Sequence, residues 1–220
     1  MKKVSLSILA CLLGGCSLFG DEGNLPLFTL KSGVYEANPF MHESIAVDVP
    51  SSEASLNTNR IAITPSSYQR DYLADGEWPD RLPKVLQEVF VESFSQRWGA
   101  ANVNRVGTGL ATHYVIQSEI FDFSVYNLNQ DQPEVHVKIL VKIMDFAHRK
   151  VLDAHTFTKT VSSSSATMVG IVSAFNNALH CLLEDAIPWM EVSFQKESAS
   201  DTRNHKLSRK GRQDNPKNSR

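Results

Sequence analysis

Alternating hydrophobic and polar residues predict a group of β-strands in the middle of the chain. The clearest strand has an aliphatic residue at every second position: Val135, Val137, Ile139, Val141 and Ile143. This period of two is typical of a strand with one buried face. Similar patterns predict strands over residues 45–49, 60–64, 113–126 and 151–161. In the 113–126 segment the apolar residues change face midway, which predicts a β-bulge.

A spacing of three to four residues between apolar positions predicts two helices. The first helix follows Asp80, which can cap it, and ends at Gly99. The second helix has an apolar face that begins at Met168, and we expect it to end at Pro188. The predicted fold class is therefore α+β, an antiparallel β-sheet with two helices packed on one face.

The N-terminus has the pattern of a secretion signal. Lys2 and Lys3 precede a largely apolar stretch of ten residues, which is too short to span a membrane. It ends in Leu13, Gly14, Gly15 and Cys16, which resembles a bacterial lipobox. The thiol of Cys16 can be acylated, and the small residues before it leave the bond open to a peptidase. We expect Leu13, Gly14 and Gly15 to be recognised by the signal peptidase and Cys16 to be lipidated. The alternatives are an ordinary signal peptide with a chance cysteine and a cytosolic protein with an apolar N-terminus.

The predicted anchor consists of acyl chains on Cys16. One chain anchors marginally, at about 0.8 kcal/mol per buried methylene, whereas two or three hold firmly. Ser17 follows the cysteine, where an Asp would retain such a protein at the inner membrane of enteric bacteria. We therefore expect an outer-membrane lipoprotein that faces the periplasm of a Gram-negative bacterium.

Charge divides the chain into segments. Residues 16–195 hold 12 basic and 21 acidic residues, whereas residues 196–220 hold eight basic and three acidic ones. We expect a signal peptide over 1–15, an acylated tether over 16–27, one domain over 28–190 and a basic disordered tail over 191–220. The tail is either a dispensable solubilising extension or a weak grip on anionic headgroups, lipopolysaccharide or cell wall. The acidic body argues against nucleic-acid binding.

The sequence lacks motifs of known catalytic or metal sites. It has no nucleophile elbow, no His-Glu-x-x-His pattern, no Cys-x-x-Cys pair and no phosphate loop. After loss of the signal and acylation of Cys16, Cys181 is the one remaining thiol, and we expect it to be a small core residue. The composition, 42% hydrophobic and 21% charged, is that of an ordinary globular protein. We expect no enzyme, no cofactor and no metal.

Several collinear segments together resemble a known family. After the lipobox come Leu-Pro-Leu-Phe-Thr-Leu at 25–30, Ile-Ala-Val-Asp-Val-Pro at 45–50, Leu-Asn-Thr-Asn-Arg-Ile-Ala at 56–62 and Trp-Pro-Asp-Arg-Leu-Pro at 78–83. The set is similar to the ABC-type transport auxiliary lipoprotein family over about residues 10–190. The basic tail lies outside the resemblance.

The resemblance implies a non-catalytic part of a lipid-transport system in the cell envelope. Its partners would be a mammalian-cell-entry (MCE) domain protein, a permease and an ATPase that move phospholipids or related hydrophobic molecules. It also implies a domain that can assemble into homo-oligomeric rings. A lipoprotein that supports cell-wall synthesis or a secretion pore is the alternative, and direct lipid carriage inside the domain is a second one.

Overall fold

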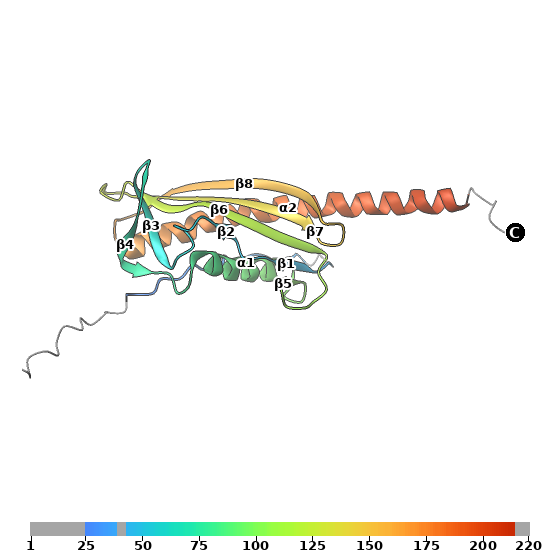
Figure 1. Ribbon diagram of the computed structural model, residues 1–220, viewed down its shortest axis with the longest axis horizontal. Coiled ribbons are helices and arrows are strands. Elements are labelled where there is room, and N and C mark those ends of the chain that lie inside the picture. The colour runs from blue at the N-terminus through green and yellow to red at the C-terminus, as the bar shows by residue number, and fades with distance from the viewer. Residues whose placement is uncertain (1–24, 39–42, 214–220) are drawn as a thin grey trace, which may run out of the picture.

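A computed structural model describes residues 25–38 and 43–213, which form one elongated body with a long protruding helix (Figure 1). The two helices are α1 (Leu82–Trp98) and α2 (Met168–Gln213). The strands are β1 (Ile45–Val47), β2 (Ser51–Ser52), β3 (Arg60–Ser66), β4 (Gln69–Glu77), β5 (Val103–Arg105), β6 (Tyr114–Tyr126), β7 (Glu134–Asp145) and β8 (Lys150–Ser162).

The strands form one curled sheet of mixed direction, so the prediction of a purely antiparallel sheet was wrong. One edge of β6 pairs in parallel with β1, β2 and β3, which lie one after another along its length. Its other edge pairs antiparallel with β7, which pairs antiparallel with β8. The parallel pairs arise because α1 lies between β3 and β6 in the sequence and carries the chain back to the starting end of the sheet.

The antiparallel meander of β6, β7 and β8 follows the predicted pattern. In β7 the five alternating aliphatic residues are buried, four of them completely. The register of β6 against β7 shifts between Ile120 and Asp122, which confirms the expected bulge. The extra residue, Phe121, is 42% exposed on the outer face of the sheet.

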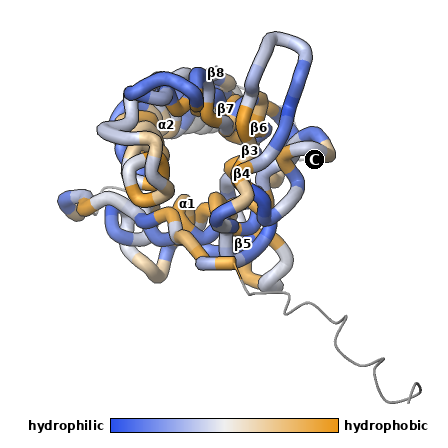
Figure 2. The backbone as a smooth tube through the Cα atoms, turned by 90° about the vertical axis from the view of Figure 1, so that its left-hand side faces the viewer, coloured by the Kyte–Doolittle hydropathy of each residue, from blue (hydrophilic) through white to orange (hydrophobic). Residues whose placement is uncertain are grey.

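Both helices lie on the concave side of the sheet, as predicted, and close a ring around the core when the body is viewed along its long axis (Figure 2). Phe123 of β6 stacks on Phe175 of α2 with ring centroids 4.6 Å apart, and Trp78 packs edge-on against both rings. At the other end of the core, Trp98 of α1 meets Phe194 of α2 at 5.8 Å. Both tryptophans are only 1% exposed, so they are packing residues.

Helix α1 matches its predicted span, but its first turn differs from the prediction. Asp80 does not cap the helix: the N-cap is Arg81, with no side-chain capping hydrogen bond. The Asp80 Oδ1 atom instead accepts the backbone N–H of Arg81 at 2.6 Å. Pro83 in the first turn has no N–H and therefore needs no acceptor, which reduces the number of donors that a side-chain cap would have to satisfy. Gly99, at φ 91°, ends it.

Helix α2 continues past Pro188 to Gln213, so the expected end at Pro188 was wrong. The disordered tail expected from residue 191 is likewise replaced by helix as far as 213; residues 214–220 lie outside the described part. Proline inside a helix costs about 3 kcal/mol. Ile187, Met190 and Phe194 are each at most 3% exposed, and their burial against the sheet outweighs that cost.

Candidate functional site

The N-terminal segment joins the body beside β4 and the start of α2. The Phe28 N–H donates to the Glu77 carbonyl at 2.8 Å, and the Glu77 N–H donates to the Pro26 carbonyl at 3.1 Å. A Cβ added at Gly76 would lie 2.4 Å from the Phe28 ring and 3.0 Å from the Met168 methyl group. The beginning of α2 is therefore next to the point where the chain joins the body. We call this the proximal end.

The predicted lipobox residues Leu13, Gly14, Gly15 and Cys16 lie outside the described residues. Eight residues separate Cys16 from Leu25, and the nine residue steps from one to the other span at most about 30 Å when fully extended. If Cys16 is acylated, the proximal end lies within about 30 Å of the membrane that holds the acyl chains.

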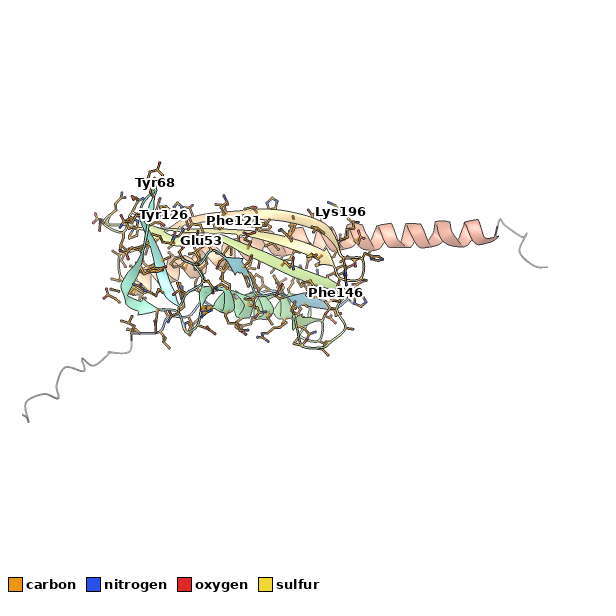
Figure 3. All side chains as sticks on the ribbon, viewed as in Figure 1. Glu53, Tyr68, Phe121, Tyr126, Phe146 and Lys196 are labelled. Atoms are coloured by element: carbon orange, nitrogen blue, oxygen red, sulfur yellow. The ribbon has the colours of Figure 1, made fainter. Side chains whose placement is uncertain are left out.

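The opposite, distal end carries two neighbouring loops with exposed hydrophobic side chains. The Phe146 N–H, in the β7–β8 turn, donates to the His113 carbonyl in the β5–β6 loop at 2.9 Å. Phe146 is 61% exposed, and Leu110 and Val106 of the other loop are 58% and 47% exposed. We call these three side chains the distal apolar patch. Figure 3 shows Phe146 at the end of the body opposite Tyr68.

A buried acid fixes the β7–β8 turn that presents Phe146. Asp145 is 7% exposed; its Oδ1 accepts the His148 N–H at 2.9 Å, and its Oδ2 lies 2.6 Å from His148 Nδ1. Burial works to raise the pKa of Asp145, but the hydrogen bonds from His148 outweigh it, so the pKa of Asp145 is lowered. The carboxylate form therefore holds the turn at neutral pH.

A polar cluster ties the two helices together near the distal end. Glu191 of α2 accepts hydrogen bonds from Arg97 Nε at 2.8 Å, from Arg97 Nη2 at 3.1 Å and from Trp98 Nε1 at 2.9 Å. Asn38 Nδ2 adds a fourth at 3.3 Å. Burial works to raise the pKa of Glu191, but the bonds from Arg97 and Trp98 lower it overall. We call this the Arg97–Glu191 clamp.

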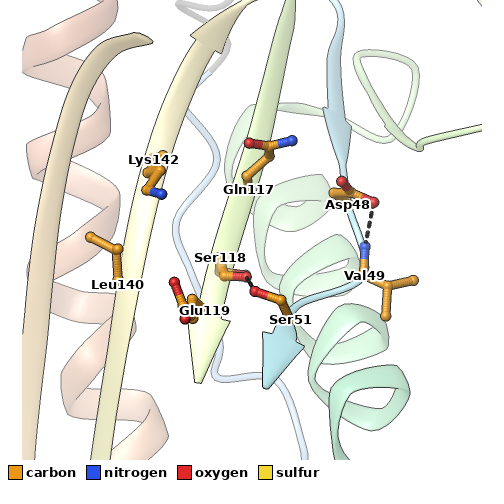
Figure 4. Close-up of a pocket in the computed structure, with 8 residues that line it drawn as sticks. All are labelled: Asp48, Val49, Ser51, Gln117, Ser118, Glu119, Leu140 and Lys142. Atoms are coloured by element: carbon orange, nitrogen blue, oxygen red, sulfur yellow. Dashed lines mark hydrogen bonds between the residues drawn. The ribbon is translucent and has the colours of Figure 1, made fainter. Parts of the chain in front are cut away.

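The outer face of the sheet has a small polar groove beside the segment that connects β1 to β2 (Figure 4). Asp48, Glu119 and Lys142 are the charged residues that line it, with Ser51, Gln117 and Leu140 beside them. Its volume of about 170 Å³ is below the roughly 300–1,000 Å³ usual for small-molecule pockets. The groove suits water, an ion or one side chain of a partner, and is too small for a phospholipid.

The described residues contain no group of three or more His, Cys, Asp or Glu side chains placed to hold a metal ion. In the same part of the chain, no helix has both the length and the hydrophobicity to cross a membrane. Cys181 is a free thiol and is half-buried, less buried than predicted. The recognisable features are thus two ends and an outer sheet face, all of them surfaces.

Comparison with known sequences identifies the family. A family model described as the ABC-type transport auxiliary lipoprotein component matches residues 29–186. The chain belongs to this family. The match includes α1, all eight strands and the first part of α2, as far as Ala186, and it stops before the basic extension.

Solved structures support the fold of this auxiliary lipoprotein. A crystal structure of a Xanthomonas campestris protein assigned to the DUF330 family is 20% identical, covers 79% of this chain and 99% of its own, and has a TM-score of 0.70. A second, uncharacterised protein is 13% identical and covers 75% of this chain and 99% of its own, with a TM-score of 0.55. No curated protein sequence matches the chain significantly.

The predicted resemblance is confirmed, but sequence reasoning missed the surfaces of the auxiliary lipoprotein. Nothing marked the loop around Leu110 or the turn at Phe146 as surface features. An apolar residue in a segment rich in glycine or charge, as in Gly-Thr-Gly-Leu at 107–110 and Asp-Phe-Ala-His at 145–148, was the available signal.

Proposed function

We propose that this auxiliary lipoprotein is anchored through acyl chains on Cys16 to the periplasmic face of the outer membrane and assists an MCE-type ABC transport system. In this role it catalyses no reaction. The system would move phospholipids or related hydrophobic molecules across the envelope, with an MCE-domain protein, a permease and an ATPase as partners. The observation that carries this proposal is the family match over residues 29–186.

The arrangement of the two ends supports the proposal and adds a docking surface. A chain held at the proximal end presents its distal end away from the membrane. The distal apolar patch is exposed at that end. Single exposed apolar residues are common on protein surfaces, whereas several exposed apolar residues on adjoining loops favour contact with another protein. We therefore place the contact with the MCE-domain protein at Leu110 and Phe146.

Site-specific crosslinking in cells tests the docking surface. A photoreactive amino acid replaces Leu110 or Phe146, and the control carries it at Tyr68, which is fully exposed at the tip of the β3–β4 hairpin. We expect an MCE-domain protein to be captured from 110 and 146 but not from 68. Capture of cell-wall synthases or a secretion-pore protein from these positions would favour the alternative function instead.

Fractionation tests the anchor separately. The variant Cys16→Ala should appear in the soluble periplasm and should not support transport, because it has no acyl chains. Retention of this variant in the outer-membrane fraction would contradict the proposed anchor. Labelling of wild-type protein with a fatty-acid analogue, absent in the variant, is the direct check.

A further inference from the structure

The last part of α2 extends beyond the body. Phe194 is the last buried residue whose side chain the structure describes, and Lys196 is exposed (Figure 3). The Lys150 ammonium group lies 3.9 Å from Glu197, which places this point of the helix beside the β7–β8 turn. The remaining sixteen residues to Gln213 add about 24 Å of helix. Figure 1 shows this segment projecting from the distal end.

Basic positions are concentrated on one side of this extension. Residues 196–213 include six basic and two acidic residues. An α-helix turns by about 100° per residue, so positions 196, 203, 206 and 210 fall within an arc of about 80°. The acidic positions 197 and 201 fall at least about 100° from the stripe's nearest edge, which is position 196. We call Lys196, Arg203, Lys206 and Lys210 the basic stripe.

The composition of the extension favours an extended anionic surface over a shaped protein pocket. Protein interfaces depend on buried aromatic and aliphatic anchors and are depleted in lysine. Between residues 195 and 213, Ala199 and Leu207 are the only apolar residues apart from one glycine. Lysine and arginine near a membrane surface gain about 1 kcal/mol each from anionic headgroups without any apolar insertion.

We propose that the basic stripe binds the anionic headgroups of a membrane surface at the distal end of the protein. The 46 residues of α2 span about 69 Å, and the helix begins next to the proximal end. If the proposed anchor at Cys16 holds, the stripe therefore reaches a surface other than the one that holds the acyl chains. The protein then bridges two membrane surfaces, a role beyond docking to a transporter.

The length of the extension explains how an acidic protein can bind an anionic surface. Residues 16–195 carry a formal charge of −9, which repels anionic headgroups. Electrostatic interactions in physiological salt decay over about 8 Å. The tip of the extension lies about three such lengths beyond the β7–β8 turn, so the charge of the body does not cancel its attraction.

Vesicle sedimentation tests the proposal with the full mature chain. The chain is first mixed with neutral phosphatidylcholine nanodiscs, then with heavy vesicles of phosphatidylcholine alone or with about 30% phosphatidylglycerol. The measured quantity is the fraction of the protein that sediments with the vesicles. This fraction can be measured both for protein held in nanodiscs and for protein that remains free. If the protein does not enter the nanodiscs, the proposed acyl anchor is wrong. If protein held in nanodiscs does not sediment with anionic vesicles, the proposed binding by the basic stripe is wrong.

Two charge-matched variants locate the binding face. Arg203→Gln with Lys210→Gln removes two charges from the stripe, and Arg209→Gln with Arg212→Gln removes two from outside it. We expect binding only to the anionic vesicles, weakened by raised salt, with an affinity about 30-fold lower for the stripe variant. The control should lose less than about 5-fold, because its charges lie farther from the surface. Equal losses in the two variants, or equal binding to neutral vesicles, would overturn the proposal.

Discussion

The Arg97–Glu191 clamp should contribute strongly to stability, and replacing Glu191 by Ala tests it. The Glu191 side chain is 12% exposed and that of Arg97 is 24% exposed, so water replaces their interaction only in part. The change also leaves Trp98 Nε1 without an acceptor, and Trp98 is 1% exposed. An unpaired buried donor costs about 1–3 kcal/mol, and hydrogen bonds to a charged group contribute about 1.5–3 kcal/mol each.

Together these values predict that Glu191→Ala lowers the free energy of unfolding by about 2–4 kcal/mol. Glu191→Gln retains an acceptor for Trp98 and should cost about half as much. The assay is urea unfolding followed by circular dichroism and tryptophan fluorescence. The control is Asp185→Ala on the same helix, which removes an exposed ion pair with Lys159 worth less than about 1 kcal/mol.

The clamp also predicts a pH dependence. Because the pKa of Glu191 is lowered in the folded protein, its contribution is complete above the ordinary carboxyl pKa and is lost as the pH falls through the folded value. The stability gap between wild type and Glu191→Gln should therefore stay constant from about pH 7 down to about pH 5 and shrink as the pH falls further, below about 4. A Glu191→Ala variant that loses no more stability than Asp185→Ala would refute the reasoning.

Three further perturbations test other parts of the structure. Phe175→Ala removes the ring stacked on Phe123 and should cost about 3–5 kcal/mol in urea unfolding; a loss below 1 kcal/mol would contradict this core. Gly76→Ala places a methyl group 2.4 Å from the Phe28 ring, so proteolysis should become faster near residue 28, with unchanged digestion as the contrary result. Burial raises the pKa of Tyr35 to about 12, so the ultraviolet titration of wild type should contain one late-ionising phenol that Tyr35→Phe lacks.

The parts of the fold set by local pattern could be predicted from the sequence. The strand through Ile139 and the helix from Leu82 to Trp98 each bury one face against the core. The spacing of apolar residues in each segment predicts which face is buried. The bulge at Phe121 was visible because it reverses the faces of one long strand.

Pairing between distant segments could not be predicted in the same way. Strand β4 was not predicted, because Gln69, Arg70 and Asp71 interrupt any alternation of apolar residues. It forms because it pairs with β3 in a hairpin. The direction of β1 against β6 depends on the path of the chain through α1, which no local pattern records. Packing of Met190 and Phe194 likewise overrides the stop signal of Pro188.

The candidate surfaces were the least predictable part. A sequence shows Leu110 and Phe146 as two apolar residues among many, and only the pairing of β6 with β7 places their loops side by side. The family resemblance needed no such pairing, since it rests on the order of short motifs along the chain.

The position of β6 has a consequence for the order in which the protein acquires its structure. β1, β2 and β3 pair in parallel with a strand that begins at residue 114. While only the first hundred residues have left the ribosome, β1 and β2 therefore lack this partner, and β3 can pair only with β4 in its hairpin. β6, β7 and β8 are joined by short turns and can form with little loss of chain entropy. Completion of the sheet is therefore delayed until the middle of the sequence is available, and the first half of a nascent chain cannot form the packed core. A chain in that state is the form that secretion machinery can thread through a membrane.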